Sequence, residues 1–136
     1  MRNMVKAGLM LIKDGSFLVT RKRKTSAFLI PGGRYKRNEN DFQCLEREIK
    51  EELNCLVDLS SLQYLDIFTD VAANEPNSSI TVRLYLGEII GTPSPSSEIA
   101  EIKWFNPKVD DISILAPSIQ NKILPYLLEH NLLTIG

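Results

Sequence analysis

The segment from Pro31 to Cys55 begins with a rigid turn and continues as a strongly patterned helix. Asn40 and Asp41 are both residue types that cap the N-terminus of a helix. Asn54 stands at the expected end, and asparagine tolerates the left-handed conformation that terminates a helix. The helix needs an apolar surface to pack against, because apolar residues at steps of three and four predict one buried stripe: Phe42, Leu45, Ile49 and Leu53.

Acidic residues crowd two turns of the same helix, where Glu46, Glu48, Glu51 and Glu52 follow one another closely. Like charges four residues apart destabilise a helix by about 0.2–0.5 kcal/mol per pair, so something must offset this repulsion. Glu51 and Glu52 stand three and four residues after Glu48, so these three carboxylates lie on one side. Mg²⁺ and Mn²⁺ prefer such oxygen ligands, and a carbonyl of the Gly-Gly turn at 32–33 can add another. The alternative is a solvated acidic face.

Length and composition describe an ordinary globular chain. The 136 residues suit one domain, 1–136, with one hydrophobic core. A net charge of −1 offers no basic surface to a polynucleotide or an anionic membrane, so we expect neither as a partner. Cys44 and Cys55 are too few for a disulfide framework or a zinc site. The apolar run near the N-terminus is too short for a membrane span and lacks a signal-peptide cleavage site, so we expect a cytoplasmic protein.

Strand patterns flank the helix on both sides. Asp14-Gly15 suits the tight turn of a hairpin, and Pro-Gly-Gly at 31–33 should break a short extended run that begins at Ser26. The segment 116–133 is patterned as a helix that Pro125 should kink or divide. Strands, helix, strands and helix in this order predict an α+β or mixed α/β sandwich. The other expected strand segments are 5–24, 62–71, 78–90 and 99–105.

The acidic helix and its preceding loop resemble the signature of the Nudix hydrolases. The matching residues, with their spacing, are Gly33, Glu39 after five residues, and after seven more Arg47, Glu48, Ile49, Glu51 and Glu52. Asn54 departs from this signature, which has a glycine there, although asparagine should preserve the helix end. Lys36 stands where many relatives carry an acidic residue. The signature covers Gly33 to about Cys55, and a looser resemblance extends over most of the chain.

The resemblance implies a fold and a chemistry. Nudix domains are α/β/α sandwiches with a mixed sheet, and the signature forms a loop–helix–loop. By resemblance, Glu48, Glu51 and Glu52 bind the divalent metal, Mg²⁺ or Mn²⁺, with help from the Gly32 carbonyl. The remaining signature residues, Gly33, Glu39 and Arg47, have a structural role, and the last two form a pair that holds the loop against the helix. The reaction is hydrolysis of a nucleoside diphosphate linked to another group.

The general base of such a reaction has several candidates. Glu48 lies beside the other expected ligands. Many relatives use a glutamate of a later loop, and here Glu98 or Glu101 can take that role. Glu98 is expected at a loop–strand junction, where catalytic groups often lie, although it can equally be a surface carboxylate. Glu101 is expected within a strand, which favours it less.

Candidate substrate contacts come from two neighbouring segments. Arg21 and Arg23 follow a strand and can face phosphates together, and because relatives often use an arginine here we predict Arg23 as a contact. A solvated strand end is the alternative. Phe28 either packs in the core or borders a nucleobase pocket. His130 is expected on the terminal helix in a surface role rather than a catalytic one.

The leading functional hypothesis is a Mg²⁺-dependent pyrophosphohydrolase of a small nucleotide, such as a canonical or modified (d)NTP. An ADP-ribose or nucleotide-sugar pyrophosphatase is an alternative within the same class. A sensor that binds a nucleotide without turnover belongs to another class, and the intact set of Glu48, Glu51 and Glu52 argues against it. An isoprenoid diphosphate isomerase would need further histidines than His130. The apolar C-terminal tail can close the core or mediate a homodimer.

Overall fold

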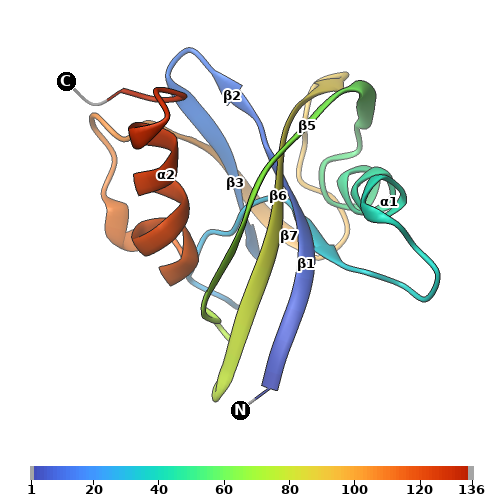
Figure 1. The fold of residues 1–136 in the computed structure, drawn as a ribbon, viewed down its shortest axis with the longest axis horizontal. Coiled ribbons are helices and arrows are strands. Elements are labelled where there is room, and N and C mark those ends of the chain that lie inside the picture. The colour runs from blue at the N-terminus through green and yellow to red at the C-terminus, as the bar shows by residue number, and fades with distance from the viewer. Residues whose placement is uncertain (1, 135–136) are drawn as a thin grey trace.

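Two sheets and two helical layers form the fold, described for residues 2–134 in a computed structural model (Figure 1). The larger sheet has the strand order β4-β1-β6-β5, in which β1 runs parallel to β6 and the other neighbours are antiparallel. The smaller, antiparallel sheet has the order β2-β3-β7. The strands are β1 (Arg2–Met10), β2 (Ile12–Lys13), β3 (Ser16–Lys22), β4 (Gly32–Arg34), β5 (Leu56–Val71), β6 (Ser78–Ile90) and β7 (Ile99–Phe105).

The helices cover opposite sides of the strands, with α1 (Asp41–Leu53) on one side and α2 (Leu124–Glu129) on the other (Figure 1). A 3₁₀ turn at Ile112–Ile114 and a π-helical turn at Ile119–Ile123 precede α2. Pro125 lies one residue after the π-helical turn passes into α2, so the C-terminal helical segment changes its hydrogen-bond pattern at the proline where the sequence predicts a kink or a division. The mixed α/β sandwich predicted from the sequence is the fold observed.

Capping residues define both ends of α1. The Asn40 side chain accepts a hydrogen bond from the Gln43 N–H at 2.8 Å, and the Gln43 side chain accepts one from the Asn40 N–H at 2.9 Å. This reciprocal capping box satisfies two backbone donors that the helix itself leaves unpaired. Asn54 ends the helix in the left-handed conformation, at φ 54°, and its N–H donates to the Lys50 carbonyl. Asn54 therefore does the work of the glycine found there in the Nudix signature.

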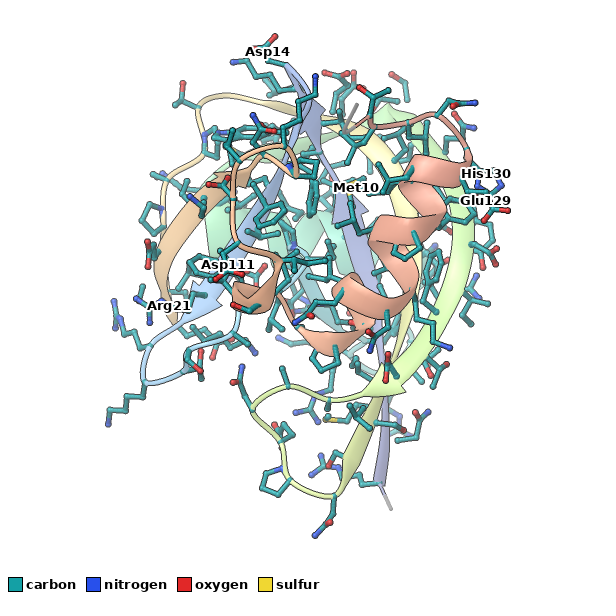
Figure 2. All side chains as sticks on the ribbon, turned by 90° about the vertical axis from the view of Figure 1, so that its left-hand side faces the viewer. Met10, Asp14, Arg21, Asp111, Glu129 and His130 are labelled. Atoms are coloured by element: carbon teal, nitrogen blue, oxygen red, sulfur yellow. The ribbon has the colours of Figure 1, made fainter. Side chains whose placement is uncertain are left out.

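Separate apolar clusters lie on the two faces of the larger sheet. Leu45, Ile49 and Leu53 of α1 are fully buried against one face, as their spacing predicts. The prediction for Phe42 was wrong: its side chain is 41% exposed and packs in an edge-to-face contact with the Tyr85 ring, whereas Asp41 in the same turn points to the sheet and accepts hydrogen bonds from Arg83 and Tyr85. The second cluster fills the space between the strands and α2, where Met10 lies (Figure 2).

The Gly-Gly segment was expected to interrupt an extended run, but in the structure it belongs to a strand. Gly32–Arg34 forms β4, which pairs antiparallel with β1 through Gly8, Ala7 and Lys6. A Cβ on Gly32 would lie 2.0 Å from the Ala7 carbonyl oxygen, so only glycine allows the two backbones to approach this closely. The residues before it form only isolated bridges, and β5 begins at Leu56, earlier than the alternation predicts. No helix within residues 2–134 has the length and apolar character needed to cross a bilayer.

Candidate active site

The ion pair of Glu39 and Arg47 ties the loop that follows β4 to the middle of α1. Arg47 donates from Nε to Glu39 Oε2 at 2.7 Å and from Nη2 to Oε1 at 2.8 Å. The same guanidinium donates to the Arg34 carbonyl at 3.0 Å and to Glu48 Oε1 at 2.7 Å. Hydrogen bonds from Arg47, with one from the Lys36 N–H, lower the pKa of Glu39 to about 2. Arg47 thus organises both the loop and a candidate metal ligand.

The lowered pKa of Glu39 makes acid stability a test of this pair. A carboxylate with pKa 4.5 when unfolded and about 2 when folded contributes stability above about pH 4.5, which is lost as pH falls through about 2. We expect Glu39→Gln to lower the thermal midpoint at pH 7 and the gap to wild type to close between pH 5 and pH 2, which scanning calorimetry over about this range can follow. A gap that persists unchanged at low pH would contradict the ionic role of Glu39.

Glu52 is a buried carboxylate, 4% exposed, at the end of α1. It accepts a hydrogen bond from the Gly32 N–H at 2.9 Å, which joins the last turn of the helix to β4. Burial raises the pKa of Glu52 to about 7, and the Lys6 ammonium and the Gly32 N–H oppose the increase. A further positive charge beside Glu52 would therefore stabilise its ionised form.

Glu48 lies directly over Gly33. A Cβ on Gly33 would fall 2.4 Å from the Glu48 carboxyl carbon and 2.5 Å from Oε2, so a larger residue would displace this side chain. Glu48 and Glu52 are thus both docked on the glycine strand β4. Glu51 is 48% exposed at its side chain and lies 3.7 Å from Arg47 Nη1.

The donor chemistry of Glu48, Glu51 and Glu52 suits Mg²⁺ or Mn²⁺, which prefer carboxylate and carbonyl oxygens. The glycine at 33 gives the Glu48 carboxylate the room that a side chain there would occupy. Among residues 2–134, however, no three His, Cys, Asp or Glu side chains already converge on a common metal position. Rotation of the exposed Glu51 side chain toward the other two would be needed to complete the set.

A cavity of about 410 Å³ opens beside these carboxylates. Its lining includes Glu48 and Glu52 from α1, Lys6 from β1 and Lys22 from β3. Glu98 also lines it and lies 3.4 Å from the Lys22 amine. Apolar side chains supply much of the remaining wall, among them Met4, Leu29, Ile30, Ile80, Val82 and Ile119. The same cavity therefore has carboxylates at one edge and apolar side chains on its wall, which suits a ligand with an anionic part and an apolar part.

The loop that carries Glu98 is fastened to the end of α1. Ser96 donates its N–H to the Glu52 carbonyl at 3.0 Å, and Ser94 donates to the Leu53 carbonyl at 3.0 Å. These bonds also satisfy carbonyls that the helix end leaves unpaired. Glu98 consequently stands at the loop–strand junction before β7, in a fixed relation to the acidic edge.

Comparison with known proteins identifies the fold and its site. Residues 2–126 match the NUDIX domain family. The chain belongs to the Nudix family. It is a hydrolase of the pyrophosphohydrolase class, as the resemblance of its signature predicts. None of the curated proteins to which it was compared matches the sequence.

Several solved structures superpose over most of this chain. A Nudix hydrolase family member from Chromobacterium violaceum is 26% identical, with a TM-score of 0.69 over 94% of this chain and 79% of that one. The E. coli ORF135 protein is 19% identical, with a TM-score of 0.71 over 96% and 94%. A bifunctional NMN adenylyltransferase/ADP ribose pyrophosphatase from Francisella tularensis, complexed with AMP and Mn, is 18% identical, with a TM-score of 0.65 over 94% of this chain and 42% of its own.

The other site residues predicted for this Nudix chain lie in varied surroundings. Arg23 is exposed and does not line the cavity, whereas Lys22 does. Arg21 donates to Glu101 at 3.1 Å, and both lie outside the cavity lining; Figure 2 shows Arg21 at the rim of the molecule, near the end of β3. Phe28 is 7% exposed and belongs to the core rather than to the cavity wall.

Some cavity residues of this Nudix chain were not predicted from the sequence. Lys6 lines the cavity from within β1, and Glu75 closes one side, 3.7 Å from the Arg34 guanidinium. A lysine within the apolar strand pattern of β1 is itself an anomaly that could have drawn attention to Lys6. His130 stacks on Tyr126 at the exposed end of α2, beside Glu129 in Figure 2, and is not among the residues that line the cavity, as its expected surface role implies.

Proposed function

We propose that this Nudix chain hydrolyses a small nucleotide in which a nucleoside diphosphate is linked to another group, such as a canonical or modified (d)NTP. The observation that carries the proposal is the single cavity with carboxylates at one edge and apolar residues on its wall. An apolar wall suits a nucleobase, and the acidic edge suits a metal-bound diphosphate. The complex of the Francisella tularensis relative with AMP and Mn supports a nucleotide and a divalent ion as the ligands.

Glu48, Glu51, Glu52 and the Gly32 carbonyl are the groups proposed to hold Mg²⁺ or Mn²⁺. A bound ion of this kind offsets negative charge on the diphosphate and lowers the pKa of water. The chain supports such a site in two ways. Glycines at 32 and 33 let both docked carboxylates lie against the backbone, and Arg47 holds Glu48 in place through its 2.7 Å hydrogen bond.

Lys22 and Glu98 are proposed to act on the substrate from β3 and from the loop before β7. Lys22 is the β3 cation that lines the cavity, so its ammonium suits a phosphate oxygen better than the exposed Arg23 does. Glu98 faces the same space, and its carboxylate can accept a proton from water. Glu48 is the alternative general base. Its hydrogen bond from Arg47 holds the carboxylate in place, which favours a role as a metal ligand.

A matched pair of glutamate variants tests the role of Glu98. We expect Glu98→Gln to lower kcat by about 10²-fold with little change in KM, because general-base catalysis contributes roughly that much. Glu101→Gln is the control, since Glu101 follows closely in sequence but pairs with Arg21 outside the cavity. Steady-state kinetics on the best substrate would measure both. Full activity of Glu98→Gln would contradict the role of Glu98 as the general base, and Glu48 would then be the remaining candidate for that role.

A substrate panel tests the proposed function itself. Canonical and oxidised (d)NTPs, ADP-ribose, a nucleotide sugar, NADH and dinucleoside polyphosphates would be incubated with Mg²⁺ or with EDTA, and the products separated by chromatography. The proposal predicts metal-dependent hydrolysis with a preference for small nucleotides. Preference for ADP-ribose or a nucleotide sugar would instead assign the alternative substrate class. Nucleotide binding without hydrolysis of any compound would identify a sensor.

A further inference from the structure

Lys6 is an unusual residue for the interior of a strand. It lies in β1, opposite Arg34 of β4 and beside Val82 of β6, and it is only 9% exposed. Its amine donates one hydrogen bond, 2.7 Å long, to the Ile30 carbonyl. Lysine is rarely buried unless its charge has a partner, so the position calls for an explanation beyond packing.

The Lys6 ammonium retains unused donor capacity in the cavity. The two other cations of the cavity lining, Lys22 and Arg34, each pair with a glutamate, at 3.4 and 3.7 Å respectively. Within residues 2–134 no carboxylate oxygen is in ion-pair contact with the Lys6 amine. An ammonium has three N–H donors and no acceptor, and one donor is engaged by Ile30. Lys6 can therefore bind an oxygen acceptor that a ligand brings.

The apolar side chains next to Lys6 suit a nucleobase as the group that brings this acceptor. Met4 on the same strand and Ile80 and Val82 on the next strand line the cavity beside Lys6 and provide an apolar wall. The acidic edge lies further along β1, where Gly8 stands opposite Gly32. The Lys6 ammonium stays within electrostatic reach of this edge, because burial lowers the pKa of Lys6 and the Glu52 carboxylate opposes that change.

We propose that Lys6 selects the nucleobase by donating a hydrogen bond to its carbonyl oxygen, an inference that rests on the proposed nucleotide substrate. Guanine, hypoxanthine, thymine and uracil present a carbonyl acceptor where adenine and cytosine present an amino donor. A donor-only ammonium pairs with the first group and opposes the second. The uncharged polar side chains of the lining do not discriminate in this way, because each has both a donor and an acceptor: Thr20, Thr25, Asn74 and Ser118.

Nucleoside monophosphates test this selection without requiring hydrolysis. IMP and AMP differ in the 6-oxo and 6-amino groups, and UMP and CMP differ likewise at position 4. Calorimetric titration of the full chain should give dissociation constants at least about tenfold lower for IMP than AMP and for UMP than CMP, as expected for a charged donor. Lys6→Met should remove the preference. Lys6→Gln, whose amide offers both a donor and an acceptor, should bind both members of each pair alike.

Lys22→Met is the matched control, since it removes the other lysine of the cavity. It should weaken all four nucleotides by a similar factor and preserve the preference. Equal binding of IMP and AMP to wild type, failure of IMP to bind, or an unchanged preference in Lys6→Met would overturn the role of Lys6. Thermal unfolding of Lys6→Met establishes that the variant is folded. Tighter binding of IMP and UMP with no hydrolysis of any nucleotide would contradict the proposed enzyme activity and support the role of Lys6. Hydrolysis with equal binding of the paired nucleotides would support the enzyme activity and contradict the role of Lys6.

Discussion

Replacing Glu52 with glutamine is expected to lower kcat on the order of 10³-fold, a typical loss for a group that stabilises the transition state. Glu52 is buried against Gly32 and faces the cavity, so the loss of its charge acts directly on the proposed metal site. The amide oxygen of glutamine can still accept the Gly32 N–H, so the contact that joins α1 to β4 should survive. Steady-state kinetics on the best substrate, with circular dichroism to verify the fold, would measure the effect.

Glu46→Gln is the control for this variant. Glu46 lies on the same helix but is exposed and absent from the cavity lining, so the same loss of charge there should leave kcat within about twofold of wild type. Comparable activity of the Glu52 and Glu46 variants would show that the acidic edge of α1 is only a solvated surface. Activity lost equally in both would point to a general effect of helix charge.

Gly32→Ala is expected to destabilise the fold by about 3–5 kcal/mol, which combines backbone strain with overpacking. Gly32 has φ +134°, a conformation that residues with a side chain rarely adopt. Its added Cβ would lie 2.0 Å from the Ala7 carbonyl oxygen, and backbone on both sides leaves little room to adjust. Separation of β4 from β1 would also displace the docking surface of Glu48 and Glu52, so activity should fall with stability.

Gly15→Ala isolates the contribution of close packing. Gly15 also has a positive φ, +78°, but nothing lies within 4 Å of a Cβ added there. Strain alone should cost about 1–2 kcal/mol. Urea denaturation of both variants gives the comparison. Equal destabilisation by the two substitutions would contradict the steric account of β4, and it would leave backbone conformation as the whole effect.

The local features of α1 could be predicted because their causes lie within the helix itself. The Asn40 cap, the left-handed Asn54 and the buried Leu45 each depend on neighbours within one or two turns. The spacing of Glu39 and Arg47 carried the resemblance, and their hydrogen bonds follow once the loop folds back on the helix. Phe42 has the spacing of a core residue, but in the first turn the polar Asp41 takes the position against β6 through its hydrogen bonds to Arg83 and Tyr85, and Phe42 stays 41% exposed.

The remaining features depend on strand pairing, which a single sequence does not specify. β4 exists because Gly32–Arg34 meets β1, a partner distant in the chain. Pairing with β7 fixes the phase of β3, so that Thr20 and Lys22 line the cavity while Arg21 meets Glu101. A shift of one residue would have exchanged these roles. Arg23 was predicted from the family resemblance rather than from the strand pattern, and it lies just beyond the end of β3. Lys6 was missed because its access to the cavity depends on the pairing of β1 with β4 and β6.

Metal binding by the acidic edge of α1 is the central claim, and titration with Mn²⁺ tests it most directly. Electron paramagnetic resonance of free Mn²⁺ would be followed as wild type and the double variant Glu51→Gln, Glu52→Gln are added. Wild type should remove Mn²⁺ from solution, and the double variant should bind it at least about tenfold more weakly, because two carboxylate ligands have become neutral amides. Equal affinity in the two proteins would contradict the account and place any bound metal elsewhere.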